Sequence, residues 1–435
     1  MPFKTVIVGT GIAGLAAGIA LADKGHQVTI LEATSKLQAI GGIIVVQANG
    51  NRALDRLGVY KKFAEVCGTK PLPGGVRRYS DGSDITARKA EIFTDQWGYP
   101  FYTIHRADYQ QVLWETAKEK GVTLHLGCRV VSVEDETTTV VLRSGERIEA
   151  DLIIGADGVK STVRTIAISD SPDAIRDCKL DVTRVNLPSA IVRSDPDTSP
   201  AMDYIALFFG PQTTIANVPI RRGGEWVLGI DYIHPRDENS ADGYSKPQDF
   251  EHMREYFKDF VPFYQKIMDY TEEANVWRII ETMPKSWTSK KGRVVIIGDA
   301  AHAVQPFVGQ GGAMAVEDAI CLAECLDRAE TIDDIPAVLR AFQEIREPRC
   351  KLVQDWSAAQ GQRATLLDGP MQEKRDEMLK KLDTETFREP WNRVHVDMNP
   401  DSIMSSEWEP WLQGHDAFIY ANKELDKRFR VRTHE

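Results

Sequence analysis

The chain has few cysteines and no long apolar segment. Six of its 435 residues are cysteine, and they form neither a CxxC pair nor a cysteine–histidine cluster with zinc spacing. This pattern argues against a disulfide framework and a structural zinc site, so no metal is expected and a reducing, cytoplasmic location is predicted. No 18 consecutive residues are apolar, so no membrane-spanning helix is expected.

An excess of positive charge is also missing. The chain has 53 Lys and Arg against 64 Asp and Glu, a formal net charge of -11. An acidic surface repels phosphate backbones, so nucleic-acid binding is not expected. The 42% hydrophobic and 27% charged residues are typical of an ordinary globular protein, and the length predicts roughly two to three domains.

A glycine motif lies between two predicted strands near the N-terminus. Residues 3–8 form a β-branched run typical of a buried parallel strand, and residues 28–31 form another. Between them, Gly9, Gly11 and Gly14 make a GxGxxG motif that opens an alanine-rich helix. The first glycine allows a tight turn, the second lets backbone N–H groups approach a pyrophosphate, and the third permits close packing of helix on strand.

Glu32 follows the second of these strands. A carboxylate in this place can accept hydrogen bonds from a ribose 2′-hydroxyl, and it would repel a 2′-phosphate. The motif and Glu32 together predict a dinucleotide site, although a plain strand–turn–helix is the alternative. They do not distinguish NAD from FAD.

Two later motifs also follow predicted strands. Residues 151–154 run into GADGVKSTVR at 155–164, and residues 294–297 run into GDAAHAVQP at 298–306. The tract VGQGGAMAVED, 308–318, then opens a helix. Taken singly, each has an ordinary explanation as a turn or a flexible loop.

In this order and spacing, the three motifs resemble those of the flavoprotein monooxygenases of the p-hydroxybenzoate hydroxylase type. The nearest resemblance is to the salicylate hydroxylase-like branch, from residue 1 to about residue 356. It implies bound FAD, transient NADH or NADPH, and hydroxylation of a phenolic or aromatic-acid substrate with O₂ through a flavin hydroperoxide. The alternative within the same chemistry is epoxidation or oxidative rearrangement of an indole or polyketide.

The resemblance also implies which residues hold FAD. The first motif would hold the ADP half, Arg106 would lie near the flavin chain, and Gly42 beside the isoalloxazine. Asp157 is associated with FAD and NAD(P)H, and Asp299 with the ribityl and pyrophosphate part. The N-terminus of the helix after residue 309 would stabilise negative charge on reduced flavin. The expected cofactor-binding residues are Gly9, Gly11, Ala13, Gly14, Glu32, Gly42, Arg106, Asp157, Asp299, Gly309, Gly311 and Gly312.

Arg184 is the expected catalytic residue. It lies in VTRVNLP and matches an arginine that faces the substrate pocket in the family, where it could pair a carboxylate or stabilise a phenolate. A surface salt bridge is the alternative. Gln47 and Tyr204 are further candidates for the pocket lining, whereas His302 is expected in the flavin-side turn and not as a general base.

The chain departs from the family pattern at three positions. Val218 stands before Pro219 where the family often has a tyrosine, which puts phenol deprotonation by a tyrosine in doubt. Ala313 replaces a frequent asparagine, at little cost because the flavin contacts there are largely backbone N–H groups. Ala48 replaces the usual proline before Asn49.

The expected fold is α/β, with a Rossmann-like FAD-binding domain, a mixed-sheet substrate domain and a helical C-terminal region. The expected boundaries are 1–71, 101–175 and 284–330 for the first, 72–100 and 176–283 for the second, and 331–435 for the third.

Three features are expected in the C-terminal region. A helix over 337–347 should stop at Pro348, and a solvated helix should cover 372–383. Trp391, Trp408 and Trp411 should pack the tail onto the domain, with dimerisation through them as the alternative. A monomer or a homodimer is therefore expected.

The later motifs distinguish this function from two others. A simple NAD-dependent dehydrogenase would not need the GADG and GDAAH motifs. A flavin-fold binding module without turnover would not need Asp299 and the glycines at 309–312. These motifs favour the monooxygenase.

Overall fold

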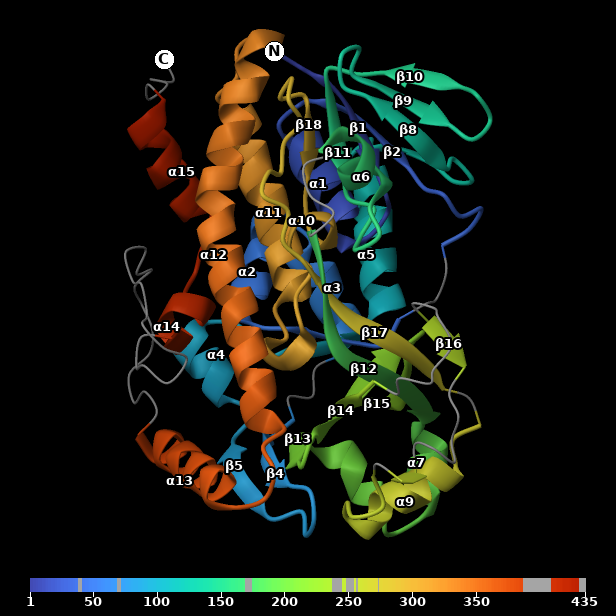
Figure 1. Ribbon diagram of the computed structural model, residues 1–435, viewed down its shortest axis with the longest axis vertical. Helices are drawn as coiled ribbons and strands as arrows, with labels where there is room; N and C mark the ends of the chain where they lie inside the picture. The colour runs from blue at the N-terminus through green and yellow to red at the C-terminus, as the bar shows by residue number, and fades with distance from the viewer. Residues whose placement is uncertain are drawn as a thin grey trace.

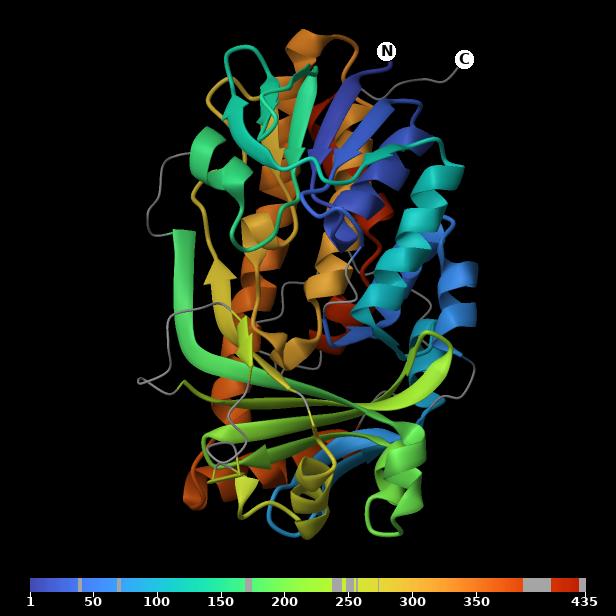
Figure 2. The ribbon, with the colours of Figure 1, turned by 90° about the vertical axis from the view of Figure 1, so that its right-hand side faces the viewer.

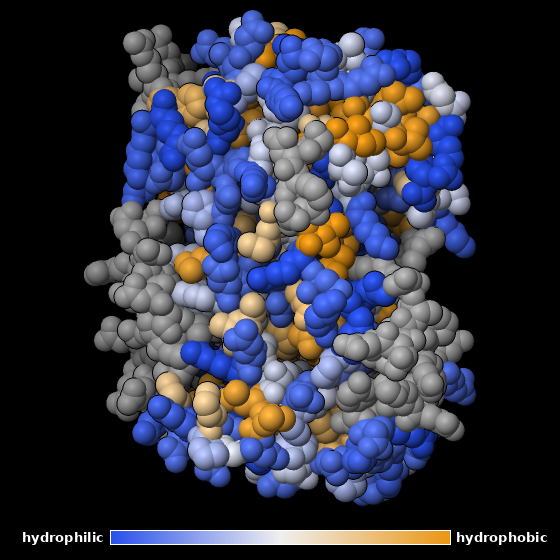
Figure 3. Space-filling view, viewed as in Figure 1, coloured by the Kyte–Doolittle hydropathy of each residue, from blue (hydrophilic) through white to orange (hydrophobic). Residues whose placement is uncertain are grey.

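The computed structural model describes residues 1–37, 41–68, 72–168, 174–236, 245–247, 254–255, 257–272, 274–385 and 408–429. A parallel sheet and its helices lie at one end of the molecule and a large mixed sheet at the other, and the long helix α12 (Ile335–Ala364) runs beside both (Figures 1 and 2). The surface shown in Figure 3 is mostly hydrophilic, with apolar residues in small separate patches.

The first sheet has five parallel strands in the order β18-β11-β1-β2-β7. Strands β1, β2, β11 and β18 are mostly apolar and buried, as is typical of a parallel sheet that is covered on both faces, whereas the edge strand β7 is short and more exposed. Their bounds are β1 Lys4–Val8, β2 Gln27–Leu31, β7 Thr123–His125, β11 Leu152–Gly155 and β18 Val294–Ile296.

Helices α1 (Ile12–Asp23), α5 (Arg106–Glu119) and α11 (Gly311–Leu326) pack together beside this sheet. Every residue of α11 from 313 to 326 is buried, including the two cysteines Cys321 and Cys325. A helix that is buried on every side has to pair any charged residue it carries, and α11 carries Glu317, Asp318 and Glu324.

The second sheet has eight strands in the order β16-β17-β12-β15-β14-β13-β4-β5. It is antiparallel except for the pair β4 and β13. One face covers a core of buried aromatic residues, including Phe208, Tyr232 and Tyr264. Its strands are β4 Gly74–Arg78, β5 Asp84–Arg88, β12 Ile175–Pro188, β13 Ile205–Gly210, β14 Thr213–Arg222, β15 Glu225–Pro235, β16 Ser245–Pro247 and β17 Asn275–Thr282.

Two small sheets and the remaining helices complete the described part of the chain. The sheets are β3 (Ile43–Val46) with β6 (Tyr102–His105), and β8 (Val130–Glu134), β9 (Thr139–Leu142) and β10 (Arg147–Glu149). The helices are α2 Ala48–Arg56, α3 Tyr60–Cys67, α4 Ile92–Trp97, α6 Thr162–Ala167, α7 Ser189–Ser194, α9 Pro262–Asp269, α10 Asp299–His302, α13 Pro370–Glu385, α14 Trp408–Gln413 and α15 Ala417–Arg428. Among the described helices, none combines the length and apolar character needed to cross a membrane.

The prediction that a helix ends at Pro348 is wrong, because α12 continues through this residue. A proline inside a helix removes one backbone hydrogen bond and costs about 3 kcal/mol. Here Arg346 and Arg349, on either side of it, are buried and ion-paired to Glu317 and Asp318 of α11. These pairs hold the helix in place on both sides of the proline.

Two further expectations for the C-terminal region have mixed outcomes. Helix α13 is not fully solvated, since Gln372, Arg375 and Asp376 are buried. Trp408 and Trp411 pack against Trp356 of α12, with ring centroids 3.7 and 5.7 Å away, so they attach the tail to the domain as expected. Trp391 lies outside the described residues.

The close approach of α1 to β1 gives a stability test. A Cβ at Gly14 would lie 2.1 Å from the Gly9 carbonyl oxygen, whereas one at Gly18 would meet only the end of the Ile30 side chain, at 2.8 Å. We expect Gly14→Ala to lower the free energy of unfolding by about 3 kcal/mol, and Gly18→Ala by about 1 kcal/mol or less, because a side chain yields more easily than backbone. Thermal unfolding of both variants measures this, and equal shifts in Tm would contradict it.

Candidate active site

A cavity of about 1040 Å³ lies between the two large sheets and is lined by residues of both. The register of the parallel sheet explains which residues reach it. Val8 pairs with Leu31 on one side and with Gly155 on the other, and Gly155 pairs with Ile296. The carboxyl ends of four strands therefore meet at one edge, and the segment that follows each of them faces the cavity.

These four segments contain the sequence motifs. Gly9, Glu32, Asp157 and Asp299 each follow one of the four strands, and all four line the cavity. Gly11, Ala13, Arg106, Gly309, Gly311 and Gly312 line it as well. The structure thus brings together residues that are separated by up to 303 positions in the sequence.

Two helices begin at this cavity without a side-chain cap. Neither Gly11, before α1, nor Gln310, before α11, caps its helix with a side-chain hydrogen bond, and neither helix has an acidic residue in its first turn. The first N–H groups of a helix lack partners within the helix and carry partial positive charge. Both N-termini can therefore donate to electronegative groups of a ligand.

Glycines keep the backbone at this edge accessible and compact. A Cβ at Gly9 would lie 2.5 Å from the Ala156 carbonyl oxygen, so the first motif and the GADG motif are in direct contact. Gly309 has a φ of +61°, in the left-handed region that favours glycine, and it turns the chain into α11. The cradle of glycines and the two uncapped helix starts fit the pyrophosphate and flavin ring of FAD.

The carboxylate of Glu32 lies at the predicted ribose position, but the chain itself surrounds it. One oxygen accepts from the Thr10 hydroxyl (2.6 Å) and N–H (3.1 Å), and the other accepts from the Thr34 hydroxyl and N–H (both 2.9 Å). Burial raises the pKa of Glu32, but these four donors outweigh it and hold the pKa below its ordinary value. A ribose hydroxyl would have to share or replace one of the threonine hydroxyls.

The two aspartates of the later motifs are used differently. Asp157 caps α6, because its carboxylate accepts from the Ser161 hydroxyl and from the N–H groups of Thr162 and Val163. Asp299 is exposed, and its carboxylate accepts no hydrogen bond from the residues that the structure describes. Of the two, Asp299 is therefore the one that can bond a ligand without giving up a bond within the chain.

Arg184 and Asp231 form a pair on the opposite side of the cavity. They are neighbours on β12 and β15, and Arg184 Nε lies 3.4 Å from Asp231 Oδ1. Both atoms are buried without a well-formed hydrogen bond to any described residue. A Cβ at Gly42 would lie 2.7 Å from Arg184 Cδ, so the pair adjoins the segment expected beside the flavin ring.

Burial raises the pKa of Asp231, and the Arg184 guanidinium offsets only part of that effect. Sequence analysis missed Asp231. The one available signal was a lone carboxylate in the otherwise apolar segment Gly229–Ile233, and a single such residue is too common to indicate a site.

The other expected pocket residues have different outcomes. Gln47 lines the cavity and donates to the Val308 carbonyl at 2.9 Å. Tyr204 does not line the cavity, because it packs beneath Arg77, whose guanidinium carbon lies 4.0 Å from the ring centroid. Val218 lines the cavity where the family often has a tyrosine.

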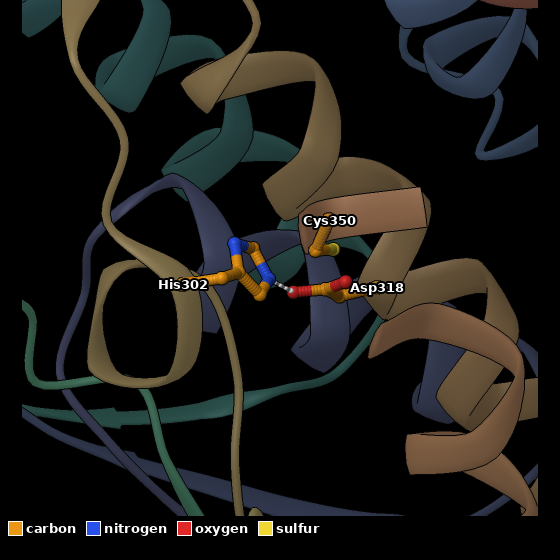
Figure 4. A group of neighbouring side chains, drawn as sticks. All are labelled: His302, Asp318 and Cys350. Atoms are coloured by element: carbon orange, nitrogen blue, oxygen red, sulfur yellow. Dashed lines mark hydrogen bonds and ion pairs between the residues drawn. The ribbon is translucent and has the colours of Figure 1, made fainter. Parts of the chain in front are cut away.

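His302 lies behind the cavity in a buried ion network. Its Nε2 is 2.5 Å from Asp318 Oδ2, while Asp318 Oδ1 accepts from Arg346 at 2.8 Å. Figure 4 shows the His302 ring facing the Asp318 carboxylate, with the Cys350 sulfur beside them. These three residues are close enough to bind a metal ion. However, the Arg346 guanidinium already contacts both the carboxylate and the Cys350 sulfur, and its positive charge opposes a cation there.

The same network connects the walls of the cavity. Arg346 and Arg349 both pair with Glu317 at 2.9 Å, and Glu317 also accepts from Asn49 at the start of α2. Arg349 donates to the carbonyls of Trp411 and Leu412 in α14. Helices α2, α11, α12 and α14 are therefore held by one set of charges.

Comparison with known proteins places these features in context. Residues 3–357 match the family model described as "FAD binding domain". The chain is 30% identical to the FAD-dependent monooxygenase atnJ of Arthrinium sp, over 87% of this chain and 89% of that protein. It is also 30% identical to hispidin-3-hydroxylase of Neonothopanus nambi, over 80% and 86%. A salicylate hydroxylase structure has a TM-score of 0.77 at 21% identity, covering 97% of this chain and 98% of that one.

The pair of His302 and Asp318 makes stability depend on pH. Burial lowers the pKa of His302, but Asp318 and Cys350 outweigh it and raise the pKa well above its ordinary value. The stabilisation from the charged ring is fully present below the ordinary histidine pKa of about 6.5, and it is lost as pH rises through the raised native pKa.

We expect His302→Gln to reduce the free energy of unfolding by about 3 kcal/mol near pH 6. The difference from wild type should shrink as pH rises through the raised native pKa, because the native imidazolium then loses its advantage. Urea unfolding at several pH values measures the difference. The same difference at every pH would show that His302 is uncharged in the native protein.

Proposed function

Because this chain belongs to the FAD binding domain family, we propose that its cavity holds FAD along the edge of the parallel sheet and an aromatic substrate over the eight-stranded sheet. The predicted class, an FAD-dependent monooxygenase acting on aromatic substrates, is confirmed by the family and the relatives. FAD is thus the bound cofactor, and transient use of NADH or NADPH is typical of the family.

One observation carries the proposal. A single cavity joins the four strand-end motifs and two uncapped helix starts on one side to the Arg184–Asp231 pair on the other. The first side suits an extended ligand with a pyrophosphate, and the second suits a ligand with an acidic hydroxyl. Bound FAD supplies the oxidation–reduction chemistry with NAD(P)H and O₂, so the chain has to bind, orient and shield the two ligands.

We assign each FAD contact to a feature of the chain. The N–H groups at the start of α1 would bind the pyrophosphate, and Asp299 would accept from ribityl hydroxyls. The N–H groups at the start of α11 would face the flavin ring, where the helix dipole stabilises negative charge. Arg106, beside Gly11 and Gly41, would add a positive charge near the pyrophosphate.

Arg184 and Asp231 would handle the proton of the substrate. Val218 leaves no tyrosine at the position where the family often has one, so another group must fill that role. The Asp231 carboxylate can accept the proton of a phenolic hydroxyl, and the Arg184 guanidinium can stabilise the phenolate that remains. A phenolate is more electron-rich than a phenol and is therefore more easily oxygenated.

The same chemistry could instead epoxidise or rearrange an indole or a polyketide. The extent of the apolar cavity floor favours this second candidate, because Ala216, Leu207 and Val76 continue it well beyond the Arg184–Asp231 pair. Products identified by mass spectrometry would separate the two reactions.

For the domains, we propose the division expected from the sequence. In its support, every strand of the eight-stranded sheet comes from residues 74–88 or 175–282. We also propose a cytoplasmic monomer or homodimer. The six cysteines are free thiols, as a reducing compartment would keep them.

FAD retention tests the cofactor site. We expect Asp299→Ala to bind FAD about tenfold more weakly, because a charge-assisted hydrogen bond to the ligand is lost. The ratio of flavin to protein after desalting, and a fluorescence titration with FAD, measure this. Asp151→Ala is the matched control, since the Asp151 carboxylate lies outside the cavity lining and accepts from the Lys4 N–H. Equal retention in both variants would remove Asp299 from the site.

The pH profile of turnover tests the Arg184–Asp231 pair. A panel of phenols identifies the one that most stimulates NAD(P)H oxidation, and kcat/KM is then measured against pH. We expect kcat/KM to rise with pH as Asp231 loses its proton, and Asp231→Asn to lack this rise. Arg184→Ala should move the rise to higher pH, because the guanidinium no longer favours the carboxylate.

Both variants should retain FAD, which separates substrate handling from cofactor binding. A profile in Arg184→Ala that matches wild type would exclude electrostatic coupling between the two residues.

A further inference from the structure

The cavity floor is apolar in the middle and polar at both ends. Along one row of the eight-stranded sheet, Asp231 pairs with Ala216, Ala216 with Leu207, Leu207 with Val76, and Val76 with Thr86. All five of these residues line the cavity. Asp231 lies at one end of the row, and the edge strand β5 lies at the other.

This row is long compared with a single benzene ring. Four strand-to-strand steps separate Asp231 on β15 from β5, and neighbouring strands lie about 4.8 Å apart, so the floor extends about 19 Å along the sheet. A hydroxybenzoate held at Arg184 and Asp231 would leave most of this apolar floor uncovered. A ligand that covers the floor needs two or more linked rings.

The far end of the floor carries a second charged pair. Arg88, on β5, donates to Glu409 Oε1 of α14 at 2.8 Å, and both side chains line the cavity. The other oxygen, Glu409 Oε2, is buried and has no hydrogen-bond partner among the described residues. A buried carboxylate oxygen without a donor is costly, and a ligand that supplies a donor removes that cost.

Helix α14 is firmly attached and so can present Glu409 in a fixed position. Gln413 accepts from the Ala48 N–H at 3.2 Å and donates to Gln47. Arg52 donates to the Gln413 and His415 carbonyls at 2.8 and 2.9 Å. Together with the bonds from Arg349 and Arg88, these contacts fix a helix of only six residues.

We propose that Glu409 is a specificity-determining residue that accepts a hydrogen bond from a hydroxyl or N–H group at the far end of an elongated, multi-ring aromatic substrate. The inference rests on the proposed function, because it requires the near end of that substrate to lie at Arg184 and Asp231. The substrate end that faces Glu409 is neutral or cationic. The Glu409 carboxylate would repel a carboxylate there. Arg88 would not offset this repulsion, because its positive charge is already paired with Glu409.

Three two-ring probes test this in the full-length, FAD-loaded protein. They are 4,4′-dihydroxystilbene, its monomethyl ether, and 4-hydroxystilbene-4′-carboxylate. Isothermal titration calorimetry gives each Kd without turnover. We expect wild type to bind the dihydroxy probe about tenfold or more tightly than the monomethyl ether, and the carboxylate most weakly, because only the first offers a donor to Glu409.

Glu409→Gln is the informative variant. Its amide oxygen can keep the bond to Arg88, which turns the amide NH₂ toward the ligand. Hydroxyl and ether oxygens both accept from NH₂, so we expect the two neutral probes to bind within about twofold of each other and the carboxylate to bind better than in wild type. Asp84→Asn is the matched control: Asp84 pairs with Arg77 on β4 at 2.8 Å, lies on β5 and does not line the cavity. It should keep the wild-type preference.

The outcomes separate the inference from the proposed function. An unchanged preference in Glu409→Gln, with FAD content and Tm like wild type, would overturn the role of Glu409 while phenol-stimulated NAD(P)H oxidation still supported the proposed function. Equal binding of the two neutral probes by wild type would also overturn the role of Glu409 and would leave the proposed function standing. If no aromatic probe bound or stimulated NAD(P)H oxidation, both would fail.

Discussion

The ion network of Glu317, Asp318, Arg346 and Arg349 holds the described structure together. Four charged side chains in an apolar interior are stable only when each one is paired and hydrogen-bonded, since the loss of one partner leaves another charge buried alone. Each pair joins different segments: Asp318 also accepts from the Gly298 N–H, Glu317 from Asn49, and Arg349 reaches the carbonyls of α14. The requirement for complete pairing therefore fixes the positions of α2, α11, α12 and α14 around the cavity.

The cavity combines two kinds of wall with different physical origins. The FAD side consists of backbone groups at strand ends and helix starts, where glycines allow close approach and side chains contribute little. The substrate side consists of side chains on alternate positions of a sheet, where a single substitution such as Val218 changes the available chemistry. A family can therefore keep the first side while its members vary the second, and the cofactor of this chain is more evident than its substrate.

The parts of this protein that could be predicted are those encoded within short stretches of sequence. The strand, glycine turn and helix of residues 4–23 follow from local pattern alone, and so does the start of the helix α11 after its glycine tract. Prediction failed where distant residues decide the outcome. Helix α12 passes through Pro348 because of arginines paired to another helix, and Tyr204 points away from the cavity to pack against Arg77. Asp231 was missed because its significance comes from Arg184 on the neighbouring strand. Glu409 was missed because its partner Arg88 lies 321 residues away in the sequence.

The hydrogen bond from the Ala48 N–H to Gln413 joins an early and a late part of the chain in one wall of the cavity. A proline at this position would have no N–H, whereas Ala48 provides a donor that fastens α14 to the beginning of α2. Ribosomes make a protein from its N-terminus, and residues 408–413 are the last of the cavity lining to emerge. The wall that carries Glu409 is thus the last part of the described cavity lining to be synthesised.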